Sequence, residues 1–138
     1  MSLAFIHGRL ATATLLFSAI CVLWGFFNYL RKQPVTSGYW GALVILQILA
    51  VVQVILGIVV FATTSGGQLL RPIVHVLYGA TLLLSLPAAY VYSGGKDRRQ
   101  ENLIYAVVCL WLVFIIERSI STGQEGIAPA VSWLLTLI

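Results

Sequence analysis

Four long runs of apolar residues, separated by short polar segments, constrain this chain more than any other feature. A membrane-spanning helix needs about 20 predominantly apolar residues. Only 9% of the residues are charged and 60% are hydrophobic, whereas a typical globular domain has about 25% charged residues. We therefore expect an integral membrane protein with four spans, at about residues 4–30, 39–63, 72–92 and 102–119.

The short connections between the runs predict how the helices pack. Neighbouring spans joined by few residues run in opposite directions, so we expect an all-α, up-down-up-down antiparallel four-helix bundle over residues 1–120. The N-terminus lacks the Lys/Arg-rich start of a signal peptide, and we expect the first run to remain as a span. Residues 121–138 end in an apolar run too short to cross a bilayer. We expect this tail to lie along the outer-side interface or to dock on a neighbouring subunit.

Positive charge is distributed unevenly between the two sides of this bundle. Five basic residues fall in the loops on one side, namely Arg31, Lys32, Lys96, Arg98 and Arg99. Three fall on the other side, namely Arg9, Arg71 and Arg118. Cytoplasmic loops carry an excess of Lys and Arg, so both termini are expected on the outer side of an inner (cytoplasmic) membrane. The expected partners are the lipid bilayer and other subunits of a membrane complex; no basic stripe with interleaved aromatic residues indicates nucleic-acid binding.

Some local features predict structure more than chemistry. Cys21 and Cys109 lie inside apolar runs without a CxxC pair, which is typical of buried thiols in helix packing. Tyr39 and Trp40 begin the second run and form an aromatic pair suited to the headgroup region of a membrane.

Polar and helix-breaking residues inside the spans need hydrogen-bond partners. Pro87 has no N–H, so it leaves the Leu83 carbonyl without its helical donor and should bend the third helix, with Ser85 available to help. Gln47 and Gln53 are expected to hydrogen-bond between helices, and a quinone contact is the alternative.

Two histidines are the strongest chemical feature. His7 lies in the outer end of the first span and His75 near the outer start of the third. These two helices run in the same direction in an up-down bundle, so both imidazoles fall in the outer half of the membrane. Bundles build cofactor sites from side chains on facing helices, and two neutral imidazoles are what a six-coordinate heme b iron requires.

The residues around the histidines are compatible with a cofactor. Arg9 and Arg71 stand at the same outer edge, where they could pair with heme propionates. Small residues at helical spacing would line the pocket: Ala11, Thr14, Gly57 and Gly79. On the first span Ala11 and Thr14 continue into a small-residue face through Ser18, Cys21 and Gly25, although such faces are also the ordinary way that membrane helices pack closely.

A count of residues along the two spans argues against the pairing of His7 with His75. His7 is 22 residues from Tyr29 and His75 is 17 residues from Tyr92, a depth difference of about 7 Å at the helical rise. Unequal tilt or the bend at Pro87 could absorb this difference. The alternatives are that both histidines are hydrogen-bonded packing residues, or that one of them binds a chlorophyll-type magnesium.

The second and third spans, LQILAVVQVILGIVVFATTSGGQLLRPIVHVLYGATLLLSL, resemble the heme A synthase family, and FIHGR in the first span is similar to that family's outer histidine followed by arginine. The resemblance implies one four-helix half of a two-bundle fold, with His7 and His75 as heme ligands. The family's glutamate three residues before the histidine is replaced here by Ala4, and its outer-loop cysteine pair is absent.

Three functions follow from these observations. The first is a cytochrome b-like, heme b-binding subunit for electron transfer in a respiratory or photosynthetic complex. The second is a cofactor-free structural subunit of such a complex. The third is a divergent heme-modifying enzyme, which ranks last because Ala4 replaces the acid; we expect no catalytic activity of the chain's own.

Overall fold

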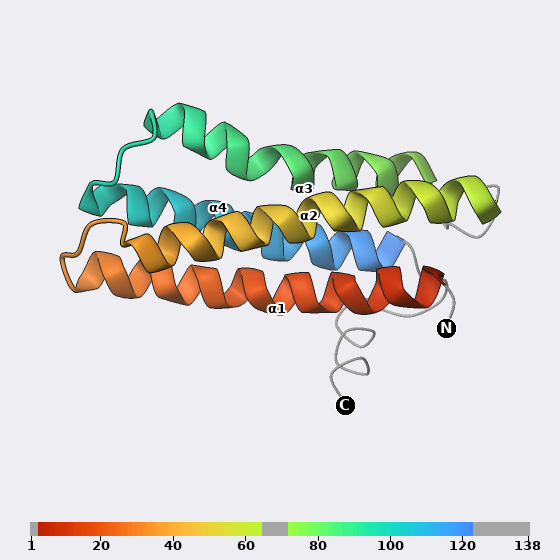
Figure 1. The fold of residues 1–138 in the computed structure, drawn as a ribbon, viewed down its shortest axis with the longest axis horizontal. Coiled ribbons are helices and arrows are strands. Elements are labelled where there is room, and N and C mark those ends of the chain that lie inside the picture. Colours follow the sequence, from red (N-terminus) through yellow and green to blue (C-terminus); the bar gives the residue numbers. More distant parts are fainter. Residues whose placement is uncertain (1–2, 65–71, 123–138) are drawn as a thin grey trace.

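The computed structural model is all-helical (Figure 1). It describes residues 3–64 and 72–122. The four helices are α1 (Leu3–Leu30), α2 (Ser37–Thr64), α3 (Pro72–Ser93) and α4 (Arg99–Thr122). Each is long and apolar enough to cross a membrane, which confirms the four expected membrane helices. The final residues of the chain, and with them the expected interfacial tail, lie outside the described residues from 123 onwards.

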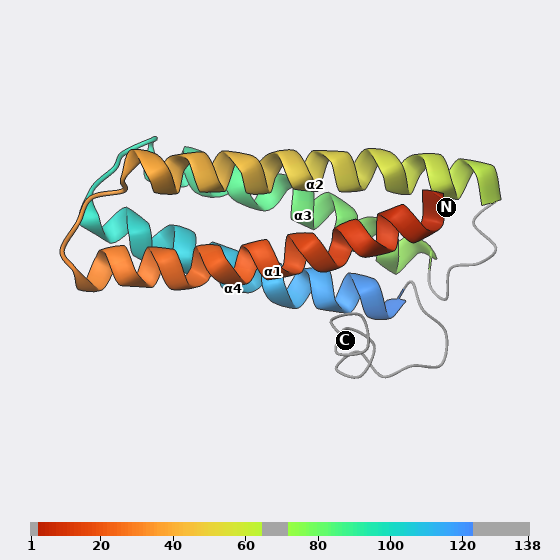
Figure 2. The same cartoon turned by 60° about the horizontal axis from the view of Figure 1, so that its bottom comes forward.

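The helices pack side by side as a bundle (Figures 1 and 2). α1 and α3 each contact both α2 and α4, and α1 packs most extensively on α4. Within the described residues the backbones of α1 and α3 do not approach each other closely, so these helices face each other diagonally across the interior. The connections 31–36 and 94–98 lie at one end of the bundle, where the Val35 N–H donates to the Asp97 carbonyl at 2.8 Å.

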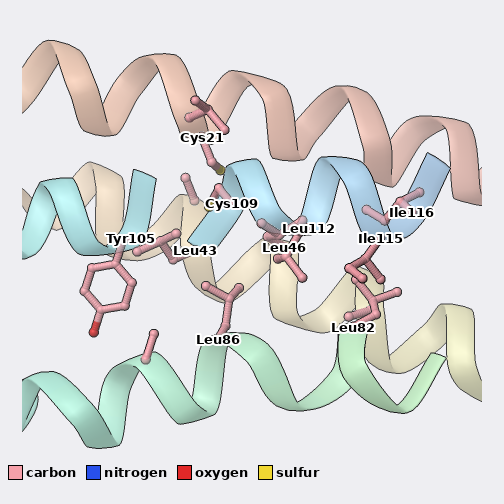
Figure 3. Packing of buried hydrophobic residues seen from close by; sticks show 14 of the residues in the cluster. Cys21, Leu43, Leu46, Leu82, Leu86, Tyr105, Cys109, Leu112, Ile115 and Ile116 are labelled. Atoms are coloured by element: carbon pink, nitrogen blue, oxygen red, sulfur yellow. The ribbon is translucent and has the colours of Figure 1, made fainter. Parts of the chain in front are cut away.

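The small-residue face of α1 is buried against α4. Thr14, Ser18 and Cys21 are fully buried. A Cβ on Gly25 would lie 2.9 Å from Ala106 Cβ of α4, closer than carbon atoms can approach. This close approach is the helix-packing role that small residues commonly have in membranes. Figure 3 shows Cys21 and Cys109 pointing toward each other across this contact, with leucines and isoleucines filling the rest of the core.

The carbonyl that Pro87 leaves without a donor is satisfied by a neighbouring helix. Gln47 Nε2 of α2 donates to the Leu83 carbonyl at 3.0 Å. The Ser85 hydroxyl donates instead to the Thr81 carbonyl at 2.6 Å, so the expected help from Ser85 is wrong. The sequence suggested Ser85 as the donor to the Leu83 carbonyl because Ser85 lies in the same helix. The actual donor, Gln47, lies 36 positions earlier in the chain, on another helix.

The aromatic pair at the start of α2 packs against the other helices. Tyr39 is fully buried and its hydroxyl donates to the Cys21 carbonyl of α1 at 2.9 Å. Trp40 packs on Tyr90 and Tyr105, with ring centroids 5.9 and 5.3 Å away. Both rings therefore turn into the bundle, where the tyrosine hydroxyl finds the hydrogen-bond partner that a buried tyrosine needs.

Apolar side chains cover much of the bundle's outside. In the most apolar stretch of each helix at most 33% of the residues are buried inside the bundle. Such a surface needs lipid or another membrane subunit around it.

Candidate histidine site

The structure brings His7 and His75 together across the diagonal of the bundle. Their ring centroids are 6.2 Å apart and the ring planes are inclined by 71°. A metal–imidazole bond is about 2 Å long, so two imidazoles on opposite sides of one iron place their ring centres about 6 Å apart. The depth difference counted from Tyr29 and Tyr92 therefore does not separate the rings; that count assumed straight helices of equal tilt, and α3 contains Pro87.

His75 is held by the end of α4. Its Nδ1 lies 3.0 Å from the carbonyl oxygen of Ser119, which is in the last turn of α4. An Nδ1–H that donates to a backbone carbonyl leaves Nε2 of a neutral imidazole without a proton, which is the tautomer that binds metals through Nε2. The same hydrogen bond is also a sufficient structural reason for a histidine at this position, because it caps a helix end.

His7 is held by α2. A Cβ on Gly57 would lie 3.1 Å from His7 Cε1, so the missing side chain of Gly57 makes room for the ring. The His7 carbonyl accepts from Gln53 Nε2 at 3.0 Å. With Gln47 on the Leu83 carbonyl, this confirms that both glutamines hydrogen-bond between helices. His7 Nδ1 is buried and has no hydrogen-bond partner among the described residues, so this imidazole retains an unused polar atom.

The interior beside the pair is closely packed. The cavity there has a volume of about 20 Å³, which suits one water molecule and not a porphyrin. Its lining residues are Ala11, Thr14, Gln53, Tyr78, Leu82, Ile115, Ile116 and Ser119. Gly57 and Gly79 do not line it. A Cβ on Gly79 would meet nothing within 4 Å.

The expected propionate partners are only partly described. Arg9 is exposed, and its guanidinium carbon lies 5.8 Å from the centroid of the Phe5 ring. Arg71 and the side chain of Ala4 fall outside the described part of the structure.

Sequence reasoning missed a second polar cluster, at the opposite end of the bundle. Asn28 Nδ2 donates to Asn102 Oδ1 at 3.3 Å, and Asn102 Nδ2 donates to the Gln33 carbonyl at 2.9 Å. Glu101 is fully buried in the first turn of α4 and pairs with Arg98. The available signal was that Asn28 and Asn102 end and begin the first and fourth spans, so an up-down bundle places them level.

The separation of the two imidazole rings suits two ligands of one metal, whereas the cavity beside them has no room for a porphyrin. Comparison with protein-family models, with curated proteins and with solved structures finds no match to this chain.

Proposed function

We propose that the chain is a heme b-binding membrane subunit in which His7 and His75 ligate one iron. The observation that carries this proposal is the 6.2 Å separation of the two imidazole centroids on helices that face each other across the bundle. Heme b would supply one-electron transfer. Two imidazoles leave no open iron position, which favours electron transfer over oxygen chemistry.

The residues around the pair support this role. The Ser119 carbonyl fixes the ring orientation and tautomer of His75, and Gly57 gives His7 its space. Arg9 and Arg71 would pair with the propionates. The sequence resemblance to one half of a heme A synthase agrees with this ligand pair, and the replacement of the family's glutamate by Ala4 argues for electron transfer and against heme modification.

The arrangement in the membrane is part of the proposal. The helices cross an inner membrane in up-down-up-down order with both termini outside. The histidines then lie in the outer half, and the connections 31–36 and 94–98 face the cytoplasm. The excess of Lys and Arg in those two connections supports this orientation, and the exposed apolar surface suits other subunits of a respiratory or photosynthetic complex.

A second candidate is a cofactor-free structural subunit, and the 20 Å³ cavity favours it. A porphyrin could enter only if the helices moved apart at the histidine end. In the structural reading, His75 caps α4 through the Ser119 carbonyl and His7 fills the space over Gly57.

An absorption spectrum of the purified, detergent-solubilised protein separates the two candidates. With heme b bound, dithionite should give reduced heme b bands that disappear in both His7→Ala and His75→Ala. Ser119→Ala keeps the backbone carbonyl that orients His75 and removes only a hydroxyl 3.4 Å from His75 Nδ1, so the heme bands should persist in this variant. A colourless, folded wild type that also takes up no added hemin would eliminate the heme proposal.

A further inference from the structure

The small cavity beside the histidine pair is itself a candidate binding site. It has a volume of about 20 Å³ and lies one helical turn further into the bundle than the histidines, between all four helices. Half of the eight described residues that line it are apolar, and Figure 3 shows two of them, Leu82 and Ile115, close together in the core. The other half are polar but uncharged, namely Thr14, Gln53, Tyr78 and Ser119.

Gln53 brings a polar atom without a partner to this cavity. Its side chain is only 8% exposed, and its Nε2 donates to the His7 carbonyl at 3.0 Å. Its Oε1 is buried and has no hydrogen-bond partner among the described residues. The oxygen and the nitrogen of an amide point in different directions, so the bond to α1 leaves Oε1 directed elsewhere. A buried oxygen without a donor is costly, and the site therefore favours a ligand that brings one.

A comparison with Gln47 shows why the cavity matters. Gln47 Nε2 also donates to a carbonyl on a neighbouring helix, and its Oε1 is also buried without a partner in the described part of the chain. Gln47 does not line the cavity, whereas Gln53 does. Of the two glutamines, Gln53 therefore has room beside it for a ligand.

The size and the walls of the cavity select the ligand. A cavity of about 10–15 Å³ or more can hold one water molecule when two to four polar groups are within reach. Thr14 is fully buried, and its hydroxyl donates to the Leu10 carbonyl at 2.8 Å, so its oxygen can still accept a hydrogen bond. Because the described lining has no charged side chain, a neutral ligand fits better than an ion. Water is also small enough to enter a closed core during local opening of the bundle.

We propose that this cavity holds one structural water molecule. Its hydrogens donate to Gln53 Oε1 of α2 and to Thr14 Oγ1 of α1, and its oxygen accepts from the hydroxyl of Tyr78 or Ser119. Gln53 also holds the His7 backbone and Ser119 also holds the His75 ring. The water thus joins residues that position both histidines. The proposal does not rest on heme, since a colourless protein would hold the water equally.

Proton NMR of the full-length protein in lipid nanodiscs tests the proposal through nuclear Overhauser transfer from water. We expect a cross-peak between water and the Gln53 side-chain amide. The Gln47 amide is the matched control within the same molecule and should give none, because Gln47 does not line the cavity. Thr14→Val should weaken the Gln53 cross-peak by removing a partner of the water. Thr12→Val should leave it unchanged, because the Thr12 hydroxyl also bonds a carbonyl four residues earlier but does not line the cavity.

Four results would overturn the proposal. Absence of the Gln53 cross-peak would show a dry cavity, and equal cross-peaks at Gln53 and Gln47 would show general penetration of solvent. Equal weakening in Thr14→Val and Thr12→Val would remove Thr14 as a partner. Loss of the cross-peak when choline replaces the sodium and potassium of the buffer would make the ligand a hydrated cation. The comparison of Gln53 with Gln47 uses the wild type, so it stays decisive if a variant fails to fold.

Discussion

At the scale of single residues, the two histidines are held by different means. His75 is fixed by a hydrogen bond to a helix-end carbonyl, whereas His7 is fixed by the shape of the space over Gly57. The His75 ring is therefore oriented by polar geometry, and the His7 ring by steric fit. A site formed in this way is most sensitive to volume on the α2 side.

Replacing Gly57 tests this dependence on volume. Gly→Ala in a helix interior normally stabilises by about 0.5–1 kcal/mol. Gly57→Ala should instead destabilise by about 1 kcal/mol or more, because the new Cβ would lie 3.1 Å from His7 Cε1. Gly79→Ala is the matched control, since its Cβ meets nothing within 4 Å, and it should stabilise. SDS titration in mixed micelles measures both, and equal effects of the two substitutions would contradict the steric account.

The sequence could not predict which individual polar side chains are buried. The up-down topology put the two histidines in the same half of the bundle although a residue count opposed their pairing, and the structure places their ring centroids 6.2 Å apart. The expected spans 72–92 and 102–119 leave Glu101 in the connection between them, yet it is fully buried. A carboxylate beside basic residues in a connection looks solvated from sequence. Whether the Glu101 side chain turns inward depends on the residue at which α4 begins and on the pairing of Glu101 with Arg98. Both depend on the tertiary structure.

At the scale of elements, α3 depends on α2 for its bend. The Leu83 carbonyl lacks a helical donor because residue 87 is proline, and Gln47 supplies the donor at 3.0 Å. Gln47→Leu should therefore destabilise by about 1–3 kcal/mol, the cost of an unpaired buried carbonyl. The loss should fall at the lower end, because Gln47 Oε1 is itself buried without a partner among the described residues and is removed too.

A double-mutant cycle isolates this contact. Alanine at position 87 restores an N–H that can donate to the Leu83 carbonyl within α3, so Gln47→Leu should cost less in a Pro87→Ala background than in the wild type. The same SDS titration gives the coupling energy. If Gln47→Leu costs the same in both backgrounds, the glutamine stabilises the bundle by some other route.

The ends of α1 and α3 use the same capping geometry with different residues. Gln33 N–H donates to the Asn28 carbonyl at 2.9 Å and Gly95 N–H to the Tyr90 carbonyl at 3.1 Å, which is the pattern of a Schellman motif. The left-handed position is Gly94 in one case, with φ 66°, and Lys32 in the other, with φ 55°. Only glycine adopts this conformation without a steric cost.

Lys32→Gly should accordingly stabilise the protein by about 1 kcal/mol, because it removes this backbone strain. Lys32→Ala removes the charge but keeps a Cβ, and it should leave stability nearly unchanged. Thermal unfolding in detergent, followed by circular dichroism, measures both variants. A gain in Lys32→Ala as large as that in Lys32→Gly would assign the effect to charge and not to backbone conformation.

At the scale of the whole molecule, the bundle has a polar, hydrogen-bonded end and a histidine end joined by an apolar middle. Four long apolar runs were enough to predict the four membrane helices, because hydrocarbon requires every backbone group to be paired within a helix. The order of neighbours was not predictable, since contact of α1 with α4 follows from the close fit at Gly25 and Ala106. That neighbour order is what places α1 and α3 on a diagonal, with their histidines facing inward.

Sided labelling of single cysteines tests how this molecule lies in its membrane. Connections 31–36 and 94–98 meet through the bond from Val35 to Asp97, so Lys32→Cys and Lys96→Cys should react with a membrane-impermeant maleimide from one and the same side. Thr63→Cys, at the far end of α2, should react from the other side.

The wild type is the control, because Cys21 and Cys109 are fully buried and should not react. The charge bias predicts that the first two positions face the cytoplasm, and in that orientation they should react in inverted vesicles and not in intact cells. Labelling of Lys32→Cys and Lys96→Cys from opposite sides would contradict the fold itself, whereas labelling of both in intact cells would reverse only its orientation.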